Sequence, residues 1–263
     1  MISDAQLREV FHFCFLQRLL RVSDPSLYVL KDGVNLRFFF SSPRYSEDMD
    51  LDVLAGSVAT LKKNGYKILE DAAFRRSLRV LGIDGIAVND PNKAKHTQTT
   101  QRFRCSLITE AGQRLPTKVE FSRRTEDPNA AAPLETIDTE IARRYRKLAY
   151  RCRHYSGNLA VVQKIEALAG RALTQTRDVF DLGILLRGGY LDAAAREGAL
   201  ARAPVSQAME CLLALGWEDY EGQVVEFLDP DSRAEFGNQA AWHELQTSVF
   251  EALESHARTV QAS

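Results

Sequence analysis

The chain of 263 residues lacks paired cysteines, a long hydrophobic run and an excess of either charge. Its four cysteines are scattered without a Cys-x-x-Cys pair, which argues against a disulfide framework or a zinc site and favours reduced thiols in a cytoplasmic protein. Charged and polar residues interrupt the apolar positions near the N-terminus, so we expect no signal peptide and no membrane span. A formal net charge of -1 argues against binding of nucleic acid by the charge of the whole protein, but it does not exclude a local basic face.

Acidic residues occupy every second position of a predicted strand that ends at Val53. Asp48, Asp50 and Asp52 alternate with apolar residues, so the acidic row should be presented and the apolar row buried. Neighbouring carboxylates repel one another unless a cation gathers them. Magnesium takes one or two carboxylates together with water and substrate phosphates, so this strand could hold a nucleoside triphosphate. A solvated strand end is the simpler alternative.

The segment before this strand contains a glycine where a phosphate could approach the backbone. Tyr28 to Leu30 predicts a short strand, Lys31 to Asn35 a turn, and Leu36 to Phe40 the start of a buried helix. Gly33 has no Cβ, and the N–H groups that open the helix would favour an anion.

Together these segments resemble a known motif. They read Leu-Lys-Asp-Gly-Val-Asn-Leu-Arg-Phe-Phe, a spacer, and Pro-Arg-Tyr-Ser-Glu-Asp-Met-Asp-Leu-Asp-Val. This resembles the first motif of the AbiEii family of nucleotidyltransferase toxins, in which Lys-Gly-Gly-Thr-Ala-Leu-Arg precedes Arg-Phe-Ser-Glu-Asp-Ile-Asp-Leu-Asp. The second half matches closely. The first half departs from the pattern at Asp32, Val34 and Asn35.

A second segment resembles the later motif of the same family. Val-Gln-Lys-Ile-Glu-Ala-Leu-Ala-Gly-Arg, which ends at Arg171, is followed by Thr-Arg-Asp-Val-Phe-Asp-Leu. On helices, Lys164 and Arg171 share one face, and Asp178 and Asp181 share a face of the next helix. The resemblance implies that Lys164 neutralises triphosphate charge and that one of the two acids orients it or acts as a base. A salt-bridge cluster between the helices is the structural alternative.

Two further features complete the predicted site. Glu120 lies between apolar residues on a predicted strand, where the resemblance implies a third metal-binding carboxylate and a surface glutamate is the alternative. Residues 141–154 carry six basic residues interleaved with tyrosines, a composition suited to RNA phosphates and base stacking as well as to a solvated helix face. These basic residues are Arg143, Arg144, Arg146, Lys147, Arg151 and Arg153.

The resemblance implies an α+β fold, with a small polymerase-β-like nucleotidyltransferase core of mixed sheet followed by an all-helical module. Loop-forming residues around Asp127 to Pro133 place the division at residues 1–130 and 131–263. We expect a helix that stops at Gly65, strands over residues 77–88, 99–109 and 114–121, and helices over 158–171, 176–186, 191–201, 206–215 and 232–260.

The implied activity is magnesium-dependent transfer of a nucleotide from a nucleoside triphosphate to RNA, with the 3′ end of tRNA as the expected acceptor. The family also implies an antitoxin with a winged-helix domain as partner. The implied catalytic residues are Asp48, Asp50, Glu120, Lys164, Asp178 and Asp181, with Asp48, Asp50 and Glu120 as metal ligands. The implied nucleotide-binding residues are Lys31, Gly33, Arg37 and Ser46.

Two alternatives stay open at this point. The first is an enzyme that nucleotidylates a small molecule or a protein. The basic run of residues 143–153 discriminates, because an enzyme that acts on RNA would need it and one that acts on a small acceptor would not. The second is a degenerate, non-catalytic binding protein, which the altered segment from Lys31 to Asn35 would explain.

Overall fold

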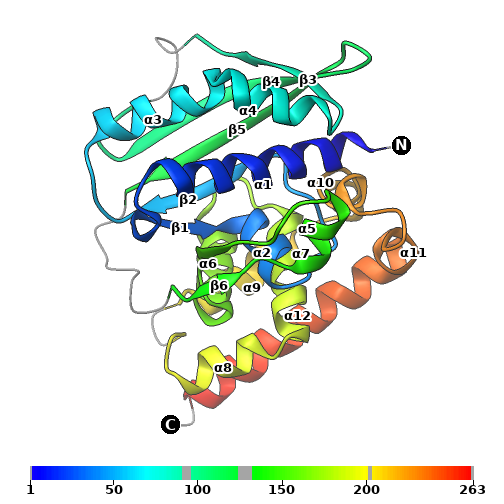
Figure 1. The fold of residues 1–263 in the computed structure, drawn as a ribbon. Coiled ribbons are helices and arrows are strands. Elements are labelled where there is room, and N and C mark those ends of the chain that lie inside the picture. The colour runs from blue at the N-terminus through cyan, green and yellow to red at the C-terminus, as the bar shows by residue number, and fades with distance from the viewer. Residues whose placement is uncertain (1, 91–95, 124–131, 201–202, 262–263) are drawn as a thin grey trace. The chain divides into compact units, whose positions relative to one another are not determined.

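The computed structural model describes residues 2–90, 96–123, 132–200 and 203–261. The chain divides into two compact units, shown as a ribbon in Figure 1. Unit 1 comprises Met1–Phe39 and Tyr45–Tyr155, and unit 2 comprises Phe40–Arg44 and Ser156–Ser263. The expected mixed α/β fold is confirmed.

Unit 1 is built on a sheet of five strands in the order β1-β2-β5-β4-β3. The strands are β1 (Tyr28–Lys31), β2 (Met49–Val53), β3 (Ile83–Val88), β4 (Thr100–Thr109) and β5 (Arg114–Ser122). β2 and β5 run parallel, and the other neighbours run antiparallel. The strands expected at 99–109 and 114–121 are confirmed, because alternating buried and exposed residues fix which face of each strand meets the core.

Three helices cover one face of this sheet, α1 (Asp4–Val22), α3 (Val58–Glu70) and α4 (Ala72–Arg79) (Figure 1). Ser3 caps α1: its hydroxyl accepts a hydrogen bond from the backbone N–H of Gln6, and the Gln6 side-chain oxygen accepts one from the Ser3 backbone N–H. Phe11, Phe13 and Phe15 of α1 are fully buried, so the helix anchors the core of unit 1.

The helix expected to stop at Gly65 continues to Glu70, so that boundary was wrong. A Cβ built on Gly65 would lie 2.4 Å from the Phe103 ring of β4. The glycine therefore lets α3 pack closely on the sheet and does not end the helix.

The single strand expected over residues 77–88 was also wrong, because α4 occupies its first residues and β3 begins at Ile83. Asp71 caps α4, and Phe74 and Leu78 bury one face of it at helical spacing. Gly82, with a φ of +88°, makes the turn into β3.

Unit 1 extends beyond the residue 130 expected as its end. The two-stranded sheet of β6 (Leu134–Thr136) and β7 (Arg151–Arg153) and the helix α5 (Thr139–Arg144) belong to it. Ile137, Ile141 and Cys152 are buried in its core. The expected boundary loop falls largely outside the described residues.

Unit 2 consists of helices, as expected for most of this half. They are α6 (Gly157–Gly170), α7 (Thr176–Arg187), α8 (Tyr190–Arg196), α9 (Val205–Leu213), α10 (Trp217–Gln223), α11 (Arg233–Phe236) and α12 (Gln239–Gln261). The helix α10 was not predicted, and the expected long final helix is interrupted at Gly237. A Cβ on Gly237 would lie 2.4 Å from the carbonyl oxygen of Arg233, and the Asn238 side chain then caps α12.

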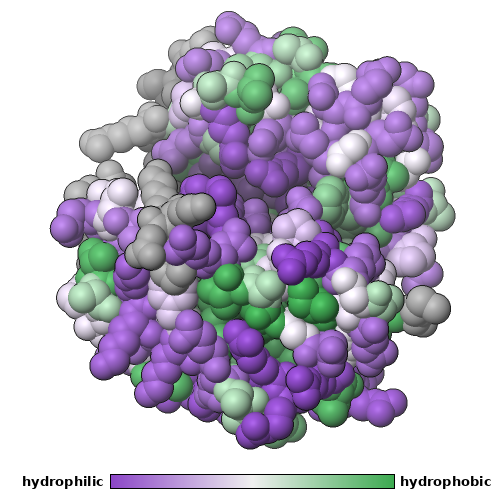
Figure 2. All heavy atoms as spheres, turned by 90° about the horizontal axis from the view of Figure 1, so that it is seen from above, coloured by the Kyte–Doolittle hydropathy of each residue, from purple (hydrophilic) through white to green (hydrophobic). Residues whose placement is uncertain are grey.

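Within the described residues no helix is both long and apolar enough to cross a membrane. Hydrophilic residues dominate the face seen in Figure 2, where hydrophobic residues gather in a few places. The described elements also include the short helices η1 (Pro25–Leu27) and η3 (Val225–Phe227) and the helix α2 (Asp32–Phe39).

Gly65→Ala should destabilise unit 1. An alanine inside a helix ordinarily adds up to about 1 kcal/mol of stability, but here the added methyl meets the Phe103 ring and overpacking should cost about 1–3 kcal/mol. Gly222→Ala in α10 is the matched control, because its Cβ would meet no atom within 4 Å. Denaturant unfolding of both variants checks this, and an equal gain in both would contradict the proposed contact.

Candidate active site of unit 1

Two carboxylates face each other across neighbouring strands of unit 1. Asp50 of β2 and Glu120 of β5 are Cα partners in the parallel register. Side chains at paired positions of adjacent strands project from the same face of the sheet. The pair that the sequence placed 70 positions apart is thus brought together by the strand pairing.

The electrostatics of Asp50 reflect this crowding. Burial and the negative charge of Asp32 raise the pKa of Asp50 to about 6, with Glu120 adding to the rise and Lys118 and Lys31 opposing it. An ionised Asp50 is therefore destabilising by itself. A bound cation would offset that cost.

Each of the two acids that flank Asp50 contacts a cation. Lys118 places its Nζ 3.0 Å from a carboxylate oxygen of Asp48 and donates its backbone N–H to the other at 3.1 Å. Arg102 of β4 forms an ion pair with Glu120. The Ser46 hydroxyl donates to the Asp48 carbonyl at 2.8 Å, so in this structure Ser46 supports the start of β2.

The third acid of the alternating row is not presented, contrary to expectation. Asp52 is fully buried, receives a hydrogen bond from Lys31 Nζ at 2.6 Å and another from the Tyr155 hydroxyl at 2.6 Å. Lys31, which the resemblance placed against the nucleotide, is thereby buried in an ion pair. In this structure the contact that Lys31 makes is therefore a structural one.

No turn separates β1 from α2, because the helix begins at Asp32 with a φ of +56°. This is the left-handed region, which asparagine, aspartate and glycine tolerate best. Gly33 is buried within the first turn of the helix. Asn35 donates to the Tyr155 carbonyl at 3.0 Å and contacts His154 at 2.9 Å, so this departure from the family motif fixes α2 to the end of unit 1.

Arg37 is likewise engaged inside unit 1. Its Nε lies 2.5 Å from a carboxylate oxygen of Glu9, and its guanidinium lies over the Tyr45 ring. The role in nucleotide binding that the resemblance implies for Arg37 remains a prediction.

The tyrosines interleaved with the basic run are not stacking surfaces. The hydroxyls of Tyr145, Tyr150 and Tyr155 donate to Glu9, the Phe13 carbonyl and Asp52 respectively. Tyr145 and Tyr155 are buried, and Tyr150 is partly buried against the core of unit 1. The expectation of base stacking is therefore wrong for this segment.

Most of the basic residues of the run have local partners. Arg143 pairs with Glu140, and Arg144 contacts the Tyr45 hydroxyl at 3.1 Å. Arg151 and Arg153 donate to the carbonyls of Leu134 and Ala132. In the part of the chain that the structure describes, Arg146 and Lys147 make no ion pair, so these two retain the most capacity for a phosphate contact.

In unit 2 the later motif forms a buried cluster of charges. Lys164 of α6 lies 3.0 Å from Asp178 and 2.8 Å from Asp181, both of α7. Arg171 contacts Asp178 at 3.0 Å, and Arg44 contacts Asp181 at 3.0 Å. Burial alone would raise the pKa of Asp181, but Arg44 and Lys164 outweigh it and hold the pKa below its ordinary value. These are the contacts of a salt-bridge cluster, and the proposed catalytic roles of these residues remain predictions.

The acids of unit 1 fit magnesium through two carboxylates. Among the described residues, no three Asp, Glu, His or Cys side chains gather closely enough to hold a metal ion. Magnesium needs only one or two carboxylates when water and substrate phosphates complete its shell. Asp50 and Glu120 meet that requirement, and Asp48 immediately precedes β2.

A cleft of about 510 Å³ lies beside Asp48 within unit 1. Lys118, Arg104, Ser106 and Asn89 line it together with Asp48. Sequence reasoning named Asp48 but missed the other four. The only available signal was that Arg104 and Lys118 occupy outward positions of their alternating strands.

The family model described as "Nucleotidyl transferase AbiEii toxin, Type IV TA system" matches residues 14–261. The chain belongs to this family of nucleotidyltransferase toxins, and the resemblance drawn from its motifs is confirmed. No curated protein matches it in sequence.

Solved structures show the same fold. MenT4, a nucleotidyltransferase toxin from Mycobacterium tuberculosis, is 20% identical with a TM-score of 0.56, over 97% of this chain and 87% of that one. JHP933 from Helicobacter pylori is 16% identical with a TM-score of 0.52, over 100% and 99% of the two chains. A putative nucleotidyltransferase from Helicobacter pylori is 14% identical with a TM-score of 0.52, over 99% and 98%.

Asp50→Asn should stabilise the metal-free protein at neutral pH. A raised carboxyl pKa means that ionisation of Asp50 lowers the free energy of unfolding. This loss of stability is absent below about pH 4 and reaches its full size above about pH 6. The variant should therefore melt at a higher temperature than the wild type at pH 7.5 in chelator, and at a similar temperature at pH 4. Glu110→Gln, in an exposed turn, is the control. A lower melting temperature at pH 7.5 would show that Asp50 is satisfied by its neighbours.

Lys164→Ala should destabilise unit 2 by about 3–5 kcal/mol, because it leaves buried Asp178 and Asp181 undercompensated. Glu166→Ala, exposed on the same helix, should change stability little. Thermal unfolding, with nucleotide transfer assayed below the melting transition, separates the two roles. A stable but inactive Lys164→Ala protein would support catalysis, and a destabilised protein with near-normal turnover would support the cluster alone.

Proposed function

We propose that this nucleotidyltransferase transfers a nucleotide from a nucleoside triphosphate to RNA in a magnesium-dependent reaction, with the 3′ end of tRNA as acceptor. The observation that carries the proposal is the outward-facing pair of Asp50 and Glu120 on adjacent parallel strands. The raised pKa of Asp50, which burial and the nearby charge of Asp32 cause, supports a functional role for this carboxylate.

Asp50 and Glu120 would hold the metal, with Asp48 as a further ligand once Lys118 moves from it to a phosphate. Magnesium bound there would lower the pKa of the acceptor hydroxyl and neutralise charge on the triphosphate. The chain's own contribution is positioning: Lys118 and Arg102 lie beside the acids, where they can take phosphate oxygens as the carboxylates turn to the ion.

Family membership supports an antitoxin partner, since the matched model describes a type IV toxin–antitoxin system. We propose that this antitoxin carries a winged-helix domain and that the toxin acts in the cytoplasm. Blocking the tRNA 3′ end would stop translation, which is the expected route to toxicity.

The alternative of a degenerate, non-catalytic binding protein rested on the altered segment from Lys31 to Asn35, and the structure gives part of that segment another explanation. Val34 and Asn35, two of the three departures from the motif, pack in the core or bind Tyr155, so they have structural reasons. Asp32 remains the exception, because its charge faces Asp50 and adds to the acidic field there. That placement is compatible with a metal ion.

The test is incubation of the protein with each labelled nucleoside triphosphate, total RNA and magnesium. We expect label in one RNA size class, from one or two of the nucleotides. Asp50→Asn and Glu120→Gln should each lower the rate by about a hundredfold or more, whereas Glu110→Gln should not. Labelling of the protein itself or of a small molecule, with RNA unlabelled, would favour the other nucleotidylation reactions. Full activity of both acid variants would contradict the site.

A further inference from the structure

A row of polar residues crosses β5 and β4 of unit 1 beside the acid pair, from Asp48 just before β2 to Asn89 just after β3. The Lys118 backbone N–H bonds to Asp48, Lys118 and Arg104 are Cα partners on β5 and β4, and the Asn89 N–H bonds to the Arg104 carbonyl at 3.0 Å. All four residues line the cleft of about 510 Å³. The row thus leads from Asp48 across the sheet.

The centre of this row is a pair of like charges. Directly opposed cations on antiparallel strands destabilise a sheet unless something negative lies between them. Lys118 has Asp48 as its partner at 3.0 Å. Arg104 is exposed and makes no ion pair with any residue that the structure describes. An anion in the cleft would reduce the repulsion between Lys118 and Arg104 and would form an ion pair with the Arg104 guanidinium.

The spacing of the row suits a chain of phosphates. Neighbouring strands lie about 4.8 Å apart, so the Arg104 backbone is about 10 Å from that of Asp48. An anion at Arg104 is therefore displaced from the acids by two strands. A polyanion with one end at the acids would meet Arg104 farther along its backbone.

The lining of the cleft fits a backbone rather than a base. Arginine presents a planar fork that matches two phosphate oxygens, and Ser106 and Asn89 can bond to phosphate or to a ribose hydroxyl. None of the described residues that line the cleft is aromatic, so it offers no stacking platform. Contacts of this kind position a strand without reading its sequence.

We propose that this cleft binds the sugar–phosphate backbone of the RNA acceptor, with Arg104 contacting a phosphate upstream of the reacting 3′ end. The proposal rests on the proposed function, because it takes RNA as the acceptor. It moves the principal RNA contact from the run of residues 143–153 to a surface formed by β4 and β5.

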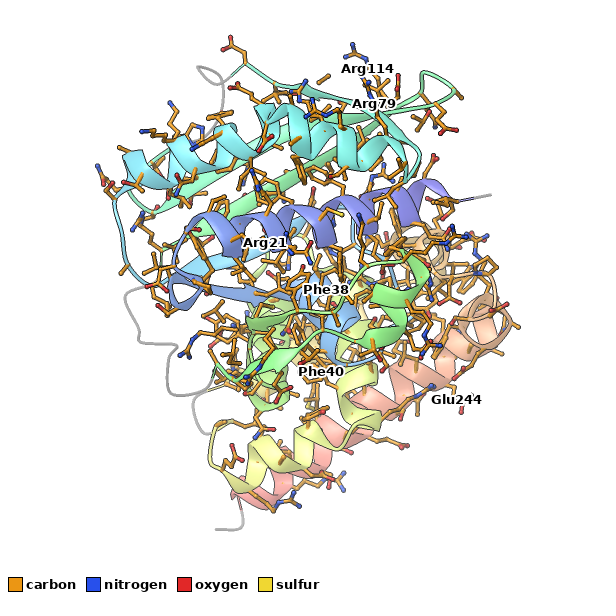
Figure 3. The ribbon with its side chains drawn as sticks, in the orientation of Figure 1. Arg21, Phe38, Phe40, Arg79, Arg114 and Glu244 are labelled. Atoms are coloured by element: carbon orange, nitrogen blue, oxygen red, sulfur yellow. The ribbon has the colours of Figure 1, made fainter. Side chains whose placement is uncertain are left out.

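The test compares Arg104→Glu with Arg114→Glu in binding to bulk tRNA over a series of salt concentrations. Arg114 is exposed on the same face of β5 but lies at the far end of that strand, and it is labelled in Figure 3. Both variants change the net charge equally. Arg104→Glu should weaken binding on the order of tenfold at low salt and reduce the salt slope by about one, whereas Arg114→Glu should leave the slope unchanged.

Binding of a nucleoside triphosphate without RNA is measured on the same proteins. Unchanged triphosphate affinity with weakened tRNA binding in Arg104→Glu supports the proposal. Equal losses for both ligands would assign the cleft to the triphosphate, and unchanged tRNA binding would remove it from recognition; either result overturns the proposal. Because no turnover is required, a wild-type protein that transfers no nucleotide would contradict the proposed function while the effect of Arg104→Glu on tRNA binding still decides the cleft.

Discussion

The buried ion pair of Lys31 and Asp52 is the contact on which the acid face of unit 1 depends. It joins β1 to β2, and the Tyr155 hydroxyl closes it from the end of the unit. Losing one partner of such a pair leaves a buried charge and costs several kcal/mol, so the register of β2 is strongly fixed. Because side chains alternate, a slip by one residue would turn Asp50 into the core. Asp52 is thus neutralised within the unit, and Asp50 is left on the face that it shares with Glu120.

Sequence reasoning predicted the fold where periodicity was strong and local. β4 and β5 alternate over their full length, so these strands were predictable. The errors have tertiary causes. Gly65 looks like a helix end in isolation, and only its contact with Phe103 explains why α3 continues past it. The segment of β6, α5 and β7 reads as basic and helical, yet its apolar residues belong to the core of unit 1.

The candidate site was predictable only in part for a related reason. Motif spacing identified Asp48 and Asp50, but pairing between strands decides which residues stand beside them. The cations Lys118 and Arg102 come from β5 and β4, and no pattern in the sequence gives their register against β2. The tyrosines of the basic run show the converse: composition suggested a surface, but their hydroxyls satisfy buried partners.

The two sets of acids in the molecule differ in their charge balance, and this bears on where the chemistry takes place. In unit 2, Lys164 and Arg44 hold the pKa of Asp181 below its ordinary value, so that carboxylate is stable without any ligand. In unit 1, burial and neighbouring acids raise the pKa of Asp50 despite the nearby Lys118 and Lys31, so further positive charge would stabilise its ionised form. A metal ion gains most binding free energy at the second kind of site, because its arrival relieves repulsion that folding has already built in. The same reasoning extends across the sheet to Arg104, which lies opposite Lys118 and, unlike Lys118, has no carboxylate partner among the described residues. Asp50, with a raised pKa, and Arg104, with no ion pair among the described residues, therefore lie on one face of the sheet and suit a ligand that brings a cation and a phosphate chain together.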